Sequence, residues 1–200
     1  MLAGLLLGCT AAGQATTTPS GSEKVVLAGG CFWGVEAVFE SLKGVSNAVS
    51  GYAGGNAVTA HYEIVSTGET GHAESVEVTY DPAKISFNQL LQVYFLVAHD
   101  PTELNRQGPD TGTQYRSAIF YTTPQQKLAA ESYIKQLERE KKFSNPIVTQ
   151  VVPLKAFYAA EDYHQHFLAH NPYNPYIVFN DMPKLKHLRE QFPALVKAGS

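Results

Sequence analysis

The sequence predicts an α+β domain, a two-layer sandwich with a mixed sheet around a ferredoxin-like βαββαβ core. Segments with strand character alternate with segments of helical apolar period, in the order strand, helix, strand, strand, helix, strand, helix, strand. This order lacks the strict strand–helix repetition of a doubly wound parallel sheet. The chain has 200 residues, 44 % of them apolar, and shows no internal repeat. One compact domain therefore accounts for it.

The first half of the chain supplies three strands and one helix. Residues 24–28, KVVLA, are a short β-branched run bounded by glycines, which is typical of a buried strand. Apolar residues then recur with helical spacing from Val35 to Leu42, and Gly44 closes that helix. Val45–Tyr52 is expected as the second strand, and His72–Tyr80 alternates as the third.

The second half begins with a helix that carries a clear start signal. Ser86 is followed three residues later by Gln89, the pattern of a capping box, just before an apolar stripe. Four more elements are expected: a strand at 116–121, a helix opening at Thr123-Pro124, a last strand at 147–152 and a short helix at 161–170.

The N-terminal segment differs in composition from the rest. Residues 1–22 are predicted to be a lipoprotein-like signal and flexible tether, and residues 23–200 the single catalytic domain. The run LLGC ending at Cys9 resembles the lipobox of bacterial lipoproteins, although the usual basic start is missing. A lipid on Cys9 would place the protein on the periplasmic side, whereas a chain without a true signal would be cytoplasmic. A disordered apolar N-terminus without significance is the alternative.

Charge excludes one class of partner. The net charge is −3 and no segment carries a Lys/Arg stripe, so a nucleic-acid or anionic-surface role has no electrostatic support. A membrane contact is expected only through a lipid on Cys9.

Cys31 lies where the first strand turns into the first helix. The unpaired N–H groups of a helix start favour a thiolate over a thiol, and Gly29 and Gly30 allow a tight turn that leaves the sulfur accessible. Free cysteine is also among the most buried residue types. A reactive thiol and a small core residue therefore both remain open from this position alone.

Glu74 shares one strand face with Val76, Val78 and Tyr80. A carboxyl group on an apolar face keeps its proton to a higher pH, as a general acid near neutral pH requires. A cation or water at the strand end is the alternative environment. The polar segment 99–117 offers further groups, Asp100, Asp110, Tyr115 and Arg116, in a region with no regular period.

Four motifs together resemble peptide methionine sulfoxide reductase of the A class. They are GCFWGVE at 30–36, GHAE at 71–74, HDPT at 99–102 and RQGPDTGTQYRS at 106–117, in the family's order. The resemblance runs from about residue 24 to 170. It implies reduction of methionine-S-sulfoxide, free or in proteins, and a role in the repair of oxidised proteins.

The resemblance also implies a role for each matching residue. Cys31 matches the nucleophile, and Glu74 the acid that protonates the sulfoxide oxygen. Phe32 and Trp33 match the apolar wall around the substrate methyl group. Three further residues match the groups that orient the oxygen: Tyr62, Asp110 and Tyr115. The match at Tyr62 departs from the family's usual local sequence.

The family's resolving cysteines have no counterpart here, because the region 170–184 carries Tyr and Pro where such a thiol would lie. The expected cycle therefore uses one cysteine: Cys31 becomes a sulfenic acid that an external thiol, such as thioredoxin, reduces. No metal and no cofactor are expected, and the protein is expected to be a monomer.

Three other functions stay open. Cys31 with His72 or His99 as its base would suit a thiol hydrolase or acyl-transferase. Asp162, His166 and His170, spaced by four residues, would suit a divalent metal on one helix side. A purely structural lipoprotein is the third possibility.

Overall fold

The computed structural model describes residues 21–199, so the expectations for the first 20 residues, including lipidation of Cys9, lie outside the described residues. Among the helices it describes, none is both long enough and apolar enough to cross a bilayer.

A six-stranded mixed sheet forms the centre of the molecule, in the order β7-β6-β1-β3-β2-β8. All neighbours are antiparallel except β6 and β7, which are parallel. The strands are β1 (Glu23–Ala28), β2 (Val45–Ala53), β3 (Ala73–Tyr80), β6 (Ala118–Tyr121), β7 (Gln150–Pro153) and β8 (Phe157–Ala159). A short hairpin of β4 (Arg106–Gln107) and β5 (Asp110–Thr111) stands apart from this sheet.

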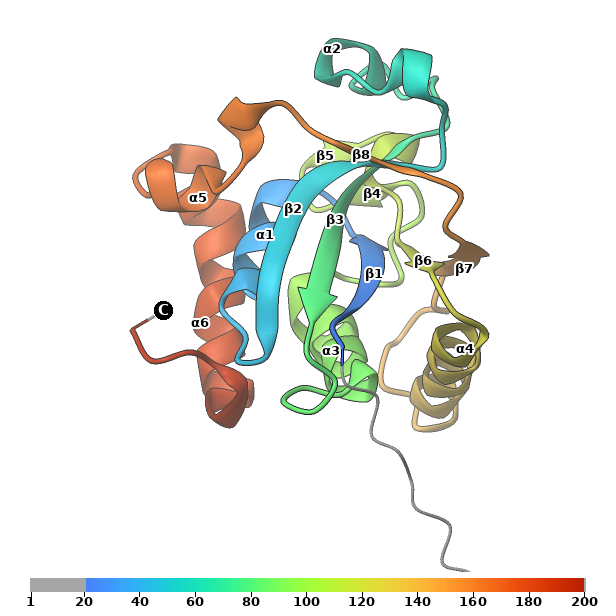
Figure 1. The fold of residues 1–200 in the computed structure, drawn as a ribbon, viewed down its shortest axis with the longest axis vertical. Helices are drawn as coiled ribbons and strands as arrows, with labels where there is room; N and C mark the ends of the chain where they lie inside the picture. Colours follow the sequence, from blue (N-terminus) through green and yellow to red (C-terminus); the bar gives the residue numbers. More distant parts are fainter. Residues whose placement is uncertain (1–20, 200) are drawn as a thin grey trace, which may run out of the picture.

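Within residues 21–199, six α-helices accompany the sheet (Figure 1). They are α1 (Phe32–Glu40), α2 (Tyr62–Val65), α3 (Phe87–Val93), α4 (Pro124–Arg139), α5 (Phe167–His170) and α6 (Met182–Gln191). A π-helical turn, Tyr94–Ala98, extends α3. Another, Ile177–Asp181, leads into α6. The prediction of an α+β fold with a mixed sheet is confirmed.

The main core lies between one face of the sheet and helices α1, α3, α4 and α6. Val25, Leu27, Val76 and Val78 of β1 and β3 are fully buried in it. The opposite face is built of smaller side chains such as Ala28 and is covered by the segment around β7 and β8. Burial of apolar area on the helical face stabilises the fold and fixes where α1 begins.

Two helix starts follow the sequence signals closely. Ser86 Oγ accepts a hydrogen bond from the Gln89 backbone N–H, and the Gln89 side-chain Oε1 accepts one from the Ser86 backbone N–H, completing the capping box. Thr123 caps α4 by accepting from Gln126 N, with Pro124 in the first turn. Both predicted helices are confirmed.

Two expectations at the C-terminal end are wrong. The strand expected at 147–152 begins only at Gln150 and is not the last, because the three-residue β8 pairs with β2. The helix expected at 161–170 is interrupted. The Gln165 side chain bonds to both backbone groups of Ser50 on β2, and His166 has a left-handed φ of 52°. Helix α6 was not predicted at all.

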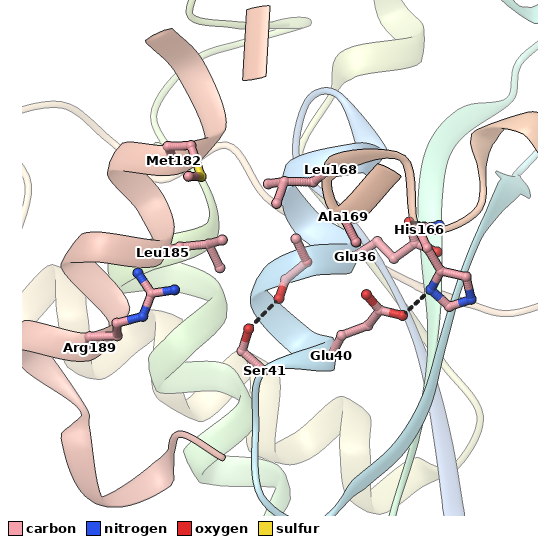
Figure 2. Close-up of a pocket in the computed structure, with 10 residues that line it drawn as sticks. Glu36, Glu40, Ser41, His166, Leu168, Ala169, Met182, Leu185 and Arg189 are labelled. Atoms are coloured by element: carbon pink, nitrogen blue, oxygen red, sulfur yellow. Dashed lines mark hydrogen bonds and ion pairs between the residues drawn. The ribbon is translucent and has the colours of Figure 1, made fainter. Parts of the chain in front are cut away.

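The interruption changes the surroundings of His166. Asp162, His166 and His170 do not share one helix, so the one-sided metal arrangement expected of them is wrong. The His166 ring instead meets Glu40 of α1, with Nδ1 and Oε1 2.5 Å apart (Figure 2).

Candidate active site

A cavity of about 340 Å³ lies at the start of α1 and brings together every site residue expected from the sequence. Its lining comes from segments far apart in the chain. The lining residues are Cys31, Phe32, Trp33, Tyr62, Glu74, Asp110, Tyr115, Asn174 and Tyr176.

Cys31 occupies the N-cap position of α1 and is 8 % exposed. Burial raises the pKa of its thiol well above the usual value, and the nearby carboxyl groups of Glu74 and Asp181 add to this. The Trp33 backbone N–H and the Lys184 ammonium act in the opposite direction. At Cys31 the effect of burial on the pKa therefore outweighs that of the helix start, while the residue still lines the cavity.

Glu74 lies on β3, 2 % exposed, facing the start of α1. Its Oε2 accepts a hydrogen bond of 3.1 Å from the Phe32 backbone N–H. Burial raises the pKa of Glu74 to about 8, and the Asp110 carboxyl contributes in the same direction. A neutral carboxylic acid therefore stands in the same cavity as a neutral thiol at pH 7.

The aromatic wall is built by Phe32 and Trp33. The Trp33 ring stacks on Phe167 at 3.7 Å, and its Nε1–H donates to His164 Nδ1 at 3.1 Å. Phe32 is 1 % exposed and packs against Tyr52 and His164. Both rings are fixed by their neighbours, so they offer a rigid apolar surface beside the sulfur.

Three polar groups complete the cavity. Tyr62 begins α2, where its backbone N–H donates to Glu161 and its ring packs on His164. Asp110 lies on β5, and Tyr115 ends a 3₁₀ turn at 113–115. Burial raises the pKa of both tyrosines, so their hydroxyl groups are proton donors across the physiological range.

Comparison with known proteins decides the identity. A family model described as peptide methionine sulfoxide reductase matches residues 23–195. The chain belongs to this family. It is a peptide-methionine (S)-S-oxide reductase.

Curated reductases from bacteria are similar along most of their length. The peptide methionine sulfoxide reductase MsrA 2 of Mesorhizobium japonicum is 61 % identical over 175 residues, covering 88 % of this chain and 90 % of the relative. The MsrA 2 of Synechocystis sp. is 54 % identical, covering 92 % and 86 %.

Solved structures agree with the fold. Mxr1 of Saccharomyces cerevisiae in reduced form has a TM-score of 0.73 at 34 % identity, covering 81 % of this chain and 92 % of that chain. Mxr1 in a complex with Trx2 has a TM-score of 0.53 at 24 % identity, covering 78 % and 91 %.

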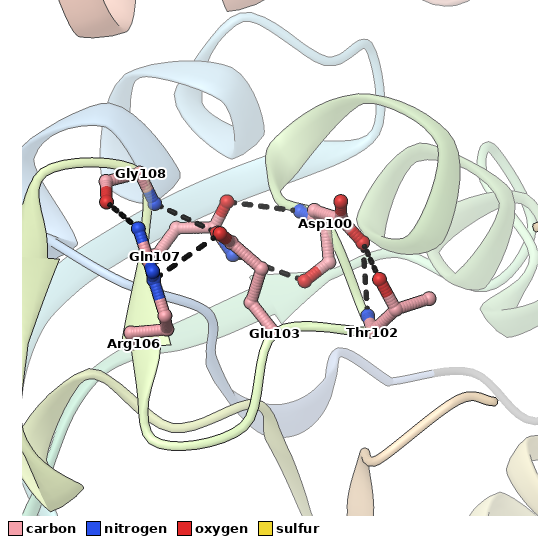
Figure 3. Close-up of polar contacts among 6 residues, drawn as sticks. All are labelled: Asp100, Thr102, Glu103, Arg106, Gln107 and Gly108. Atoms are coloured by element: carbon pink, nitrogen blue, oxygen red, sulfur yellow. Dashed lines mark hydrogen bonds and ion pairs between the residues drawn. The ribbon is translucent and has the colours of Figure 1, made fainter. Parts of the chain in front are cut away.

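A polar loop holds Asp110 of this reductase in place. The Gln107 side chain makes two hydrogen bonds to the backbone of Asp100, and Glu103 contacts both Arg106 and Gly108 N (Figure 3). The same Gln107 lies over Gly30, where an added Cβ would come within 2.5 Å of it. Gly30 also has φ of +88°, which favours glycine. The loop is therefore packed directly onto the turn that carries Cys31.

Sequence reasoning missed Asn174 and Tyr176. The Tyr176 hydroxyl donates a short hydrogen bond to Asp110 Oδ2, and its ring meets Trp33 edge-on at 5.9 Å. Both residues lie in the motif NPYNPY at 171–176. The only signal in this motif was that it carries no cysteine. Tyr176 fills the reductase cavity from the part of the chain where a resolving thiol was sought.

Replacing Tyr176 by Phe should lower kcat/KM for methionine sulfoxide by about 10- to 100-fold, because a hydrogen bond to a charged carboxylate contributes roughly 1.5–3 kcal/mol. The ring that contacts Trp33 is kept. Steady-state kinetics on both proteins measures the effect. Tyr173→Phe is the matched control, since Tyr173 is 92 % exposed in the same segment. Equal kcat/KM in Tyr176→Phe and the parent would show that the hydrogen bond from the Tyr176 hydroxyl to Asp110 does not contribute to the reaction.

A buried ion pair beneath α1 was also missed. Asp181 is fully buried and accepts from Lys184 Nζ at 3.0 Å. An added Cβ at Gly34 would come within 2.0 Å of Asp181 Oδ1, so only glycine allows the pair to pack against the first turn of α1. Lys184 is the cation that favours the Cys31 thiolate.

The two histidines considered as hydrolase bases lie outside the cavity lining. His72 accepts from Gly55 N and donates to Asn56 O. His99 donates to Tyr94 O and accepts from Ser117 Oγ, and burial lowers its pKa to about 4. Both rings are neutral and hydrogen-bonded at both nitrogens, so neither offers a free base to Cys31.

Glu74→Gln should make the protein more stable at high pH. The folded pKa of about 8 lies above the usual 4.5, so the parent loses stability as pH rises between these values, because the unfolded carboxyl ionises first. The amide stays neutral and still accepts from Phe32 N. Thermal melts at pH 5 and pH 9 should show a melting-temperature gain for Glu74→Gln that is larger at pH 9. A gain independent of pH would contradict the raised pKa.

Proposed function

We propose that this reductase works by a one-cysteine cycle in which Cys31 is the nucleophile and Glu74 the general acid. One observation carries the proposal: the thiol and a carboxyl with a pKa of about 8 line the same cavity. A sulfoxide oxygen leaves only when protonated, so the reaction needs a soft nucleophile and a neutral acid together.

In the first step, the Cys31 sulfur attacks the sulfoxide sulfur while Glu74 gives its proton to the oxygen. The thiol proton passes to the Glu74 carboxylate, so Glu74 ends the step protonated. The hydroxyl group then moves from the substrate sulfur to the Cys31 sulfur as the bond between the two sulfurs breaks, which leaves a Cys31 sulfenic acid and releases methionine. Two electrons pass from the cysteine sulfur to the methionine sulfur.

The other cavity residues position the substrate. Phe32 and Trp33 offer a rigid apolar wall for the S-methyl group, and Tyr62, Tyr115 and Asp110 orient the sulfoxide oxygen. The support is their common place in the lining and the proton-donor state of the two tyrosines.

An external dithiol restores Cys31. One thiol attacks the sulfenic sulfur and releases water, and the second thiol then frees Cys31 as the reductant becomes a disulfide. Two facts support a thioredoxin as this reductant. The sequence has only two cysteines, and one of them, Cys9, lies in the predicted tether. Yeast Mxr1 has been solved in a complex with Trx2. The same cycle would repair oxidised methionine in proteins.

Turnover of the full-length chain with thioredoxin tests the cycle. Cys9→Ser should reduce methionine-S-sulfoxide at the parental kcat. After reaction with the sulfoxide and before reduction by thioredoxin, the enzyme should contain Cys31 sulfenic acid. Loss of thioredoxin-supported turnover in Cys9→Ser, or a Cys9–Cys31 disulfide in the mass spectrum of the parent, would contradict a one-cysteine cycle.

We also propose that residues 1–22 form a signal and tether and that a lipid on Cys9 holds the monomeric domain on the periplasmic side. The LLGC run and the uncharged first 20 residues support this. Mass spectrometry of protein from a bacterial membrane fraction tests it. A diacylglyceryl group on an N-terminal Cys9 is expected, and an unmodified Met1 start in the cytosol would contradict it.

For the fold, we propose that β1–α1–β2–β3–α3–β6 is a ferredoxin-like core. The antiparallel order β6-β1-β3-β2 supports this.

A further inference from the structure

A second cavity, of about 320 Å³, lies between α1, α5 and α6 and shares no described lining residue with the cavity of Cys31. Figure 2 shows two glutamates of α1 and a histidine at its edge. Glu36 and Glu40 are four residues apart, so they lie on one face of α1. His166 reaches them from the interrupted segment that precedes α5.

The three side chains are arranged as a ligand set. One ligand atom from each of Glu36, Glu40 and His166 lies within 4.8 Å of the other two. The segment is anchored there twice: His166 N donates to Glu36 Oε2 at 3.0 Å, and its ring meets Glu40.

Glu36 supplies an independent reason to expect a ligand. Its side chain is 1 % exposed, and Oε1 has no hydrogen-bond partner among the described residues. A buried carboxylate oxygen without a hydrogen-bond partner destabilises the fold. A cation at this point would satisfy the oxygen and favour the ionised form.

We propose that Glu36, Glu40 and His166 form a binding site for a divalent transition-metal ion, with Zn²⁺ as the best match. An imidazole nitrogen and two carboxylate oxygens suit zinc, and three protein ligands leave a fourth position for water. Two ligand atoms of one tetrahedral zinc lie about 3.4 Å apart. Glu40 and His166 must therefore separate from their present 2.5 Å contact, which their side-chain exposures of 30 % and 51 % allow.

The bound ion would act on stability and not on the sulfoxide chemistry. It would join α1 to the segment that carries His164 and Phe167, which both contact the Trp33 ring. The ion would therefore help to hold the Trp33 ring, which is part of the aromatic wall of the active site, in place.

Calorimetric titration with zinc chloride tests the site. The full-length chain is used as Cys31→Ser in a Cys9→Ser background, after removal of metal, so that no thiol competes for zinc. One equivalent should bind with release of protons and should raise the melting temperature. Glu40→Gln and His166→Asn should each weaken binding at least tenfold.

His187→Asn is the matched control, because His187 is an exposed histidine of α6 outside this cavity lining. It should bind zinc as the Cys31→Ser parent does. No saturable binding, or equal binding in His166→Asn and the parent, would overturn the proposal. Equal weakening in His187→Asn would overturn it too, since it would show binding by surface histidines in general.

Discussion

Cys31→Ser is expected to reduce kcat for methionine-S-sulfoxide by at least about 10⁴-fold, to the rate seen with reductant alone. Removing a catalytic nucleophile costs up to about a million-fold in well-studied enzymes. The serine hydroxyl is a far weaker nucleophile toward sulfur, and no other described residue in the cavity is a thiol. Steady-state assays with dithiothreitol measure the loss.

The loss of activity in Cys31→Ser is informative only if the variant folds as the parent does. Serine fits the space of the thiol, so the circular dichroism spectrum and melting temperature should stay close to those of the parent. Cys9→Ser serves as the matched control and should keep full activity with dithiothreitol. More than about one hundredth of the parental kcat in Cys31→Ser would contradict the assignment of the nucleophile.

Glu74→Gln should lower kcat by about 10²- to 10⁴-fold, the usual contribution of general acid catalysis. The pH dependence of kcat shows whether this loss comes from the Glu74 carboxyl. In the parent, activity should fall as pH rises through about 8, because Glu74 loses the proton that it must donate. In Glu74→Gln, this fall due to the carboxyl should disappear.

Glu77→Gln on the same strand is the control for a charge change alone. Glu77 pairs with Lys24 on the partly exposed surface, so its amide should leave both kcat and the pH profile unchanged. A parental fall in activity near pH 8 that persists in Glu74→Gln would assign the titration to another group and contradict the role of Glu74.

Sequence reasoning singled out Glu74 and Cys31 because one lies in a regular strand and the other at the start of a helix, and the family resemblance then implied their roles. The twofold alternation of β3 places Glu74 with Val76 and Val78, and the structure buries all three. The apolar period after Cys31 marks the start of α1 in the same way. Local periodicity was enough to predict a carboxyl on an apolar strand face and a thiol at a helix start, but it left the burial of the thiol open.

Tyr176, Asp181 and Lys184 could not be found this way. They reach the start of α1 from the far end of the chain, through a π-helical turn and a helix with no marked apolar period. Their places depend on tertiary packing, such as the contact of Asp181 with Gly34. No local pattern in 170–191 indicates that approach.

Two opposing effects act on the pKa of the Cys31 thiol, and the larger one decides its direction. A helix start stabilises an anion by about 0.3–1 kcal/mol, whereas full burial can raise a thiol pKa by several units. The structure has both effects at Cys31, and burial is the larger. The thiol is therefore expected to react with its proton transfer coupled to Glu74, and not as a preformed thiolate.

Single turnover without reductant tests the central claim most directly. The full-length reduced enzyme is mixed with excess methionine-S-sulfoxide, and methionine and Cys31 sulfenic acid, trapped by dimedone, are counted together by mass spectrometry. One methionine per enzyme and one trapped sulfenic acid on Cys31 are predicted. Methionine formed while Cys31 stays a thiol, or with Cys31 in a disulfide to Cys9, would contradict the account.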